Sequence, residues 1–140
     1  MVRDSHTLMH ELERFEPEDG NWLPLDDLVQ EIIISPAPEQ TAEAMMGLFE
    51  RHPEEDGYGI FWTMLREIER FPGYEKTVFE SLNRKPSMFS VLMVGRMLTS
   101  DRYANEAEFL AGKLRAVLAD PAVPECITDA ARAYLERHGG

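Results

Sequence analysis

Cysteine is nearly absent from this sequence. Cys126 is the only one among 140 residues, so no disulfide framework can form within the chain. A lone cysteine fits a reducing compartment. A catalytic role is disfavoured as well, because the surrounding sequence, ECITDAARAYL, indicates the start of a helix and no histidine follows before His138.

Long apolar runs are also missing. No stretch approaches the roughly 20 residues of a membrane-spanning helix, and the opening residues, MVRDSHTLMHELERF, lack the apolar core of a signal peptide. Apolar residues still make up 44% of the chain, which is ordinary for a globular protein and too high for a disordered one. We therefore expect one soluble, cytoplasmic domain over residues 1–140.

Basic residues are scarce in the first 60 positions. Those positions hold fifteen acidic residues and only Arg3, Arg14 and Arg51, so they carry the whole net charge of −12, and the rest of the chain is neutral. This asymmetry argues against binding to nucleic acids or to anionic membranes. It favours a basic partner that is attracted at long range, although acidic residues can also serve solubility alone.

Signatures of familiar enzyme classes are absent. The GYG at 57–59 is too short for a phosphate-binding loop, and the GxSxG of serine hydrolases does not occur. His6 and His10 have the spacing that can hold a metal on one helix face, but no third ligand is evident. A metal-dependent enzyme is therefore a minor hypothesis, and we expect no catalytic residue, no metal and no cofactor.

The acidic run EEDG at 54–57 resembles part of a calcium loop. Counting ligand positions from Asp56 brings in Tyr58 and Ile60, whose side chains cannot coordinate calcium. A turn explains the run better, because Pro53 ends one helix and the acids then lie at the start of the next. The helix dipole favours negative charge there, so we expect some of these acids to serve that helix.

Helical spacing of apolar residues dominates the chain, and no stretch alternates apolar and polar residues over the length of a strand. The short run EIIIS follows a helical pattern and is interpreted as the end of a helix. Pro53, Pro86 and Pro121 lie 33 and 35 residues apart and separate segments of helical pattern. Eight helices are predicted, at about 4–15, 25–34, 39–51, 57–70, 74–84, 87–100, 106–119 and 124–137.

The period near 34 residues favours an all-α fold of stacked antiparallel helix hairpins, described best as HEAT-like. An irregular helical bundle would give much the same pattern and remains the alternative. The helix at 87–100 is apolar almost all round and should be central. Trp62 lies off the core face of its helix, so in a stack we expect it to be buried against the next hairpin. Trp22 fits either a packed loop residue or a contact with a partner.

The segment GYGIFWTMLREIERFPGYEKTVFESLNRKPSMFSVLMVGRML, residues 57–98, resembles segments of small, acidic, all-helical bacterial immunity proteins. Such proteins are encoded beside polymorphic or contact-dependent toxins. The resemblance covers about a third of the chain and includes no catalytic motif. It implies a protein without enzymatic activity that binds and occludes a cognate toxin, often a basic nuclease domain, in the cell that makes it.

We therefore expect an immunity protein whose acidic N-terminal half docks on a basic toxin. "EPEDGNW" at 16–22 and "PEEDGYG" at 53–59 are similar turns in that half, and aromatic residues with charged neighbours are common at interaction hot spots. A general helical-repeat adaptor for protein partners is the alternative. The predicted partner-binding residues are Glu18, Asp19, Trp22, Asp26, Asp27, Glu54, Glu55, Asp56 and Tyr58.

Overall fold

The computed structural model describes residues 4–34 and 40–138, and this part of the chain is built from helices. No strand forms in it, and Glu18 and Asn21 make one isolated bridge. The predicted all-α class with eight α-helices is confirmed, with one additional 3₁₀ helix between the helices predicted at 87–100 and 106–119. The elements are α1 (Ser5–Arg14), α2 (Leu23–Ile33), α3 (Gln40–Arg51), α4 (Ile60–Ile68), α5 (Tyr74–Arg84), α6 (Met88–Leu98), η1 (Asp101–Glu106), α7 (Ala107–Ala119) and α8 (Glu125–Arg137).

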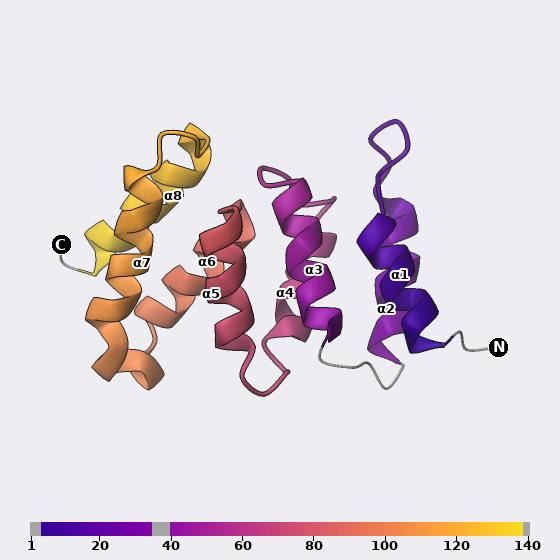
Figure 1. Ribbon diagram of the computed structural model, residues 1–140, viewed down its shortest axis with the longest axis horizontal. Helices are drawn as coiled ribbons and strands as arrows, with labels where there is room; N and C mark the ends of the chain where they lie inside the picture. Colours follow the sequence, from indigo (N-terminus) through magenta and orange to yellow (C-terminus); the bar gives the residue numbers. More distant parts are fainter. Residues whose placement is uncertain (1–3, 35–39, 139–140) are drawn as a thin grey trace.

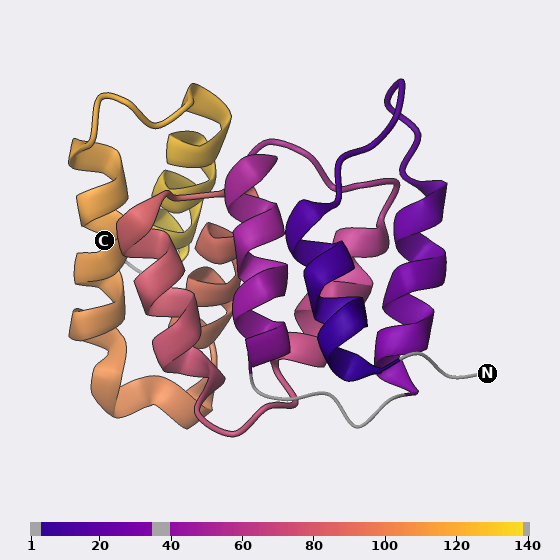
Figure 2. The same cartoon turned by 45° about the vertical axis from the view of Figure 1, so that its right-hand side comes forward.

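The helices form four consecutive hairpins that stand side by side in a row (Figure 1). The two earliest helices, α1 and α2, make a hairpin of their own ahead of the three hairpins whose connections contain Pro53, Pro86 and Pro121. Helices α1, α3 and α5 contact one another in turn in one layer, and α2, α4, α6 and α8 do so in the other. Figure 2 shows the two layers from another side.

The row has two edges with different connections (Figure 1). The turn edge carries the connections within the hairpins, which are residues 15–22, 52–59, 85–87 and 120–124. The linker edge carries the connections between hairpins, among them residues 69–73 and 99–106. As a result, segments that are some 35 residues apart in sequence lie next to each other along each edge.

Helix α6 is the centre of the fold, as its apolar sequence predicts. It contacts helices of its own, the preceding and the following hairpin, and eight of its eleven residues are buried. Met93 and Met97 are among these core residues, and Met88 is half-buried. Ser87 begins the helix with a capping box, in which Ser87 and Ser90 each satisfy the other's backbone N–H.

A chain of aromatic rings joins the first three hairpins. Phe61 of α4 lies with its ring centre 5.3 Å from that of Trp22 and 4.9 Å from that of Phe49. Phe89 of α6 continues the chain, 5.2 Å from Phe49 and 5.3 Å from Trp62. Edge-to-face and tilted ring pairs add about 0.5–1.5 kcal/mol each beyond their buried area, so this cluster holds the hairpins in register.

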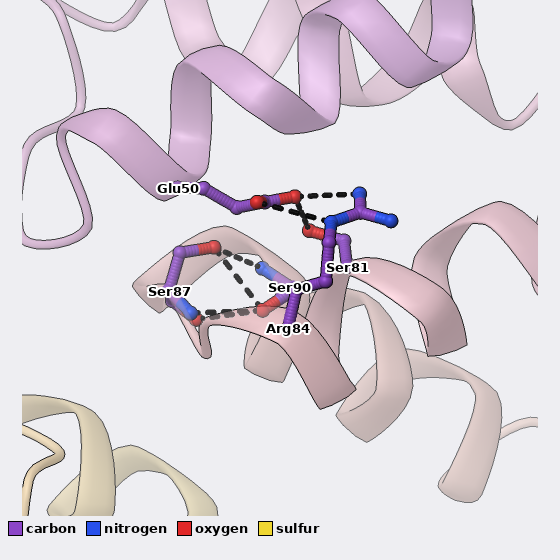
Figure 3. A network of polar contacts seen from close by, with 5 residues as sticks. All are labelled: Glu50, Ser81, Arg84, Ser87 and Ser90. Carbon is purple, nitrogen blue, oxygen red and sulfur yellow. Dashed lines mark hydrogen bonds and ion pairs between the residues drawn. The ribbon is translucent and has the colours of Figure 1, made fainter.

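A polar network joins α3 to α5 (Figure 3). The Glu50 carboxylate accepts hydrogen bonds from the Ser81 hydroxyl at 2.7 Å and from Nη2 and Nε of Arg84 at 2.8 and 3.3 Å. This partner raises the pKa of Arg84 above its usual value. Ser81 is fully buried, so Glu50 supplies the acceptor that its hydroxyl needs within the hairpin interface.

None of the described helices combines the length with the apolar content that a bilayer crossing requires.

Candidate functional site

The two acidic turns of the N-terminal half meet at the turn edge. The hydroxyl of Tyr58, in the connection 52–59, donates a hydrogen bond of 2.8 Å to the carbonyl oxygen of Gly20, in the connection 15–22. Beneath them, the Trp22 ring packs edge-on against His52, with ring centres 4.9 Å apart, as well as against Phe61. The two connections therefore form one surface, although they belong to different hairpins.

The tip of the first turn is a tight reversal at Asp19 and Gly20. Both have positive φ, at 53° and 75°, and the flanking Glu18 and Asn21 bridge each other, with an Asn21 N–H to Glu18 carbonyl bond of 2.9 Å. Two central residues with positive φ define a type I′ turn, for which Asp-Gly is a preferred pair. The reversal presents Glu18 and Asp19 to solvent.

The second turn is held in an unusual backbone conformation. Gly57, Tyr58 and Gly59 have φ values of 56°, 58° and 84°. Such a conformation costs a residue other than glycine on the order of 1–3 kcal/mol and persists only where its surroundings enforce it. The hydrogen bond to Gly20 provides that support, so Tyr58 is held in one orientation while its side chain remains 62% exposed.

Gly57 is required for the same packing. A Cβ on this residue would lie 2.8 Å from the Phe61 ring and 3.3 Å from the Trp22 ring, both of which are buried. The second turn thus fits closely over the aromatic cluster, and its acidic residues extend from a rigid base.

The acidic side chains of this surface are mostly free of internal partners. Within the described ranges, no hydrogen bond or ion pair engages the carboxylates of Glu18, Asp19, Asp26, Asp27, Glu55 and Asp56, and all six residues are exposed. We expected some of the acidic residues at 54–56 to serve the start of α4, but none of their carboxylates accepts a hydrogen bond from an N–H group there. Gly59 occupies the N-cap without any side-chain hydrogen bond, and the backbone carbonyls of Asp56 and Gly57 accept the first N–H groups instead.

Two other acids do have partners. Glu16 lies at the base of the first turn, with Oε1 3.4 Å from Nε of Arg51 and Oε2 2.9 Å from Nε2 of His52. The His52 contact does not have hydrogen-bond geometry. Arg51 also donates to the carbonyl oxygens of Leu12 and Phe15 at the end of α1. Arg51 and His52 therefore join α1 to α3 below the acidic surface, a role that no local sequence pattern indicates.

Glu54 connects the second turn to the C-terminal hairpin. Its Oε1 accepts a bond of 3.2 Å from the thiol of Cys126, near the start of α8. Burial raises the pKa of the Cys126 thiol, and the hydrogen bond to Glu54 raises it further. A raised pKa leaves less thiolate at neutral pH and makes the thiol a weaker nucleophile.

Eight of the nine predicted partner-binding residues are exposed, and Trp22 is the exception. Its side chain is only 4% exposed because the two turns close over it, so it supports the surface from below and is not available as a contact. The prediction that Trp62 is buried is wrong. Its ring packs against Phe89 of the next hairpin, with ring centres 5.3 Å apart, but Trp62 remains 38% exposed.

The histidines of α1 are not gathered into a metal site. His6 and His10 are exposed, and no cluster of three or more His, Cys, Asp or Glu side chains suited to a metal ion occurs among the described residues. Oriented negative charge beside an exposed aromatic ring is instead suited to the recognition of a basic protein surface.

Comparison with protein-family models, with curated proteins and with solved structures gave no match.

Proposed function

We propose that this chain is a non-catalytic immunity protein that binds and neutralises a cognate bacterial toxin in the cytoplasm of the cell that makes it. The partner would be a basic, nuclease-type toxin domain that docks on the turn edge of the first two hairpins. The observation that carries the proposal is the Tyr58–Gly20 hydrogen bond, because it joins two separate acidic turns into one surface. The resemblance of residues 57–98 to immunity proteins supports it as well.

The mechanism follows from the free charges of this surface. Uncompensated carboxylates on one part of a molecule attract a basic partner at long range and can raise association rates by a factor of ten to a thousand. Tyr58 then offers a fixed aromatic ring, the kind of residue that forms hot spots and slows dissociation. A toxin covered in this way is excluded from its substrate, with no chemical step by this chain.

The test is a charge reversal in the second turn. Glu54→Lys, Glu55→Lys and Asp56→Lys are combined, and the variant is expressed with the toxin domain encoded by the neighbouring gene. We expect loss of protection of the host and an association rate, measured by stopped-flow mixing, that falls at least tenfold and depends less steeply on salt.

A matched control reverses three exposed acids outside the acidic half, Glu80, Asp101 and Glu136. It changes the net charge by the same amount and should leave protection and the association rate nearly unchanged. If the second-turn variant still neutralises the toxin at an unchanged rate, the proposed docking surface is wrong. Capture of several unrelated partners without any protection would point to the adaptor alternative.

A further inference from the structure

A cavity of about 480 Å³ lies at the linker edge, away from the acidic turns. It lies where the end of α4, the start of α5, the end of α6 and η1 come together. Small-molecule sites in proteins commonly have volumes of about 300–1,000 Å³. The residues of its lining that bear on its chemistry are Glu69, Tyr74, Arg96, Ser100, Arg102 and Tyr103.

The acidic groups in and beside this cavity are already engaged. Both oxygens of Glu69 accept from Arg96, with Nε–Oε2 at 3.2 Å and Nη2–Oε1 at 3.0 Å, which is the strong two-point form of this pair. The Tyr103 hydroxyl donates to Oε2 of Glu75 at 2.7 Å. Arg96 therefore balances the charge of Glu69, which is the one carboxylate among the described residues of the lining, whereas Glu75 lies outside the lining.

The two tyrosines form an ordered relay. Their hydroxyl oxygens lie 3.2 Å apart. Because Tyr103 donates its one hydroxyl proton to Glu75, Tyr74 must be the donor in this pair. Partial burial is the main cause that raises the pKa of both tyrosines, so both keep their protons at neutral pH. The hydrogen bonds of this wall therefore run in one direction, from Tyr74 to Tyr103 and from Tyr103 to Glu75.

The unused groups of the lining are donors. The guanidinium of Arg102 lies 5.4 Å from the centre of the Tyr103 ring, and within the described part of the chain no carboxylate pairs with it. The backbone N–H of Arg102 donates to Oγ of Ser100 at 3.3 Å, which leaves the hydroxyl proton of Ser100 without an acceptor among those residues. An acceptor with negative charge would complete the site.

We propose that this cavity binds a small organic anion, a carboxylate or a phosphate monoester. Its charged group would lie between Arg102 and Ser100, and the rest of the molecule would lie against Tyr74. The site belongs to the neutral part of the chain, where acidic and basic residues balance, and is separate from the acidic turns. It therefore does not depend on the proposed toxin binding.

The experiment is a titration of the ¹⁵N-labelled full chain, followed by two-dimensional NMR. Phenyl phosphate and benzoate are the probes, and they distinguish phosphate from carboxylate recognition. We expect saturable shifts in the amide signals of residues 99–103 with at least one of them. Arg102→Gln should weaken that binding about tenfold or more, because it removes the cationic hydrogen-bond donor that is proposed to contact the anion.

Two controls make the result decisive. Arg132→Gln removes an exposed arginine of α8 that pairs with Asp129 and should bind as the unaltered chain does, while the neutral probe benzyl alcohol should bind far more weakly than the preferred anion. The proposal is overturned if neither anion gives saturable shifts at residues 99–103, if Arg102→Gln binds equally well, or if benzyl alcohol matches the anions. Unchanged signals elsewhere in the spectrum would verify that Arg102→Gln is folded.

Discussion

Gly95 allows α6 and α8 to pack closely, and replacing it tests the core of the fold. A Cβ at this position would come closer than 3.0 Å to three atoms of the Tyr134 ring on α8. Real Cβ atoms essentially never come so close to other atoms, so Gly95→Ala must displace either the ring or the helix. Because α6 also contacts α5 and α7, the helix has little freedom to move.

Two opposing effects set the magnitude. Overpacking in a filled core costs about 1–3 kcal/mol and sometimes more, whereas alanine is favoured over glycine in a helix by about 1 kcal/mol. The clash involves ring atoms near the stem of the side chain, so the cost should be at the upper end. We expect Gly95→Ala to lower the free energy of unfolding by about 2 kcal/mol, or the melting temperature by about 4–8 °C.

The assay is urea and thermal unfolding followed by circular dichroism, with two comparisons. Gly112→Ala in α7 meets no atom within 4 Å, so it should gain the helix preference alone and stabilise the protein by about 0.5–1 kcal/mol. In a Tyr134→Ala background the clash is removed, and Gly95→Ala should then stabilise as well. If Gly95→Ala stabilises the unaltered chain, or costs the same in both backgrounds, the ring contact is not what constrains this position.

Three further predictions address the contacts between hairpins. Glu50→Ala leaves the buried Ser81 hydroxyl without its acceptor and should lower the free energy of unfolding in urea by about 1–3 kcal/mol. Glu50→Gln keeps an acceptor and should lower it less. An equal decrease in both variants would contradict this role of Glu50. Tyr58→Phe keeps the ring but removes the hydrogen bond between the two acidic turns, so amide hydrogen exchange in residues 15–22 should accelerate. Unchanged exchange rates would show that this hydrogen bond does not hold the turns together. Burial and Glu54 both raise the pKa of Cys126, so the pH at which its alkylation by iodoacetamide reaches half the maximal rate should lie above the corresponding pH for a free thiol. Glu54→Gln should lower this midpoint pH. An unmoved midpoint would mean that Glu54 does not act on the thiol.

The helices were predictable because their signals are local. The spacing of Phe61, Met64, Leu65 and Ile68 along α4 identifies a buried face without knowledge of what covers it, and all four side chains are buried. The uniformly apolar sequence of α6 likewise predicts a central helix. The concentration of acidic residues in the first 60 positions was also evident in advance, because the segregation of charge is a property of the sequence alone.

The assembly of the site was less predictable because it depends on contacts between hairpins. Nothing near Tyr58 in the sequence indicates that its hydroxyl reaches Gly20, a contact across 38 residues. The Asp19-Gly20 pair did carry a local signal for a type I′ turn. The burial of Trp22 and the half-exposure of Trp62 were not determined by the pattern, because a ring beside a helix face can be covered or left open by the next hairpin.

The bond between the two acidic turns has a consequence for the order in which the molecule can open. The hairpin of α1 and α2 stands at the end of the row, and within the described part of the chain its main contacts are with α3 and α4 of the next hairpin. In a linear array, an end unit can detach while the rest stays folded. Detachment would carry Gly20 away from Tyr58 and divide the proposed binding surface in two. A partner that spans both turns binds only the closed form, so its binding energy adds directly to the stability of this end hairpin.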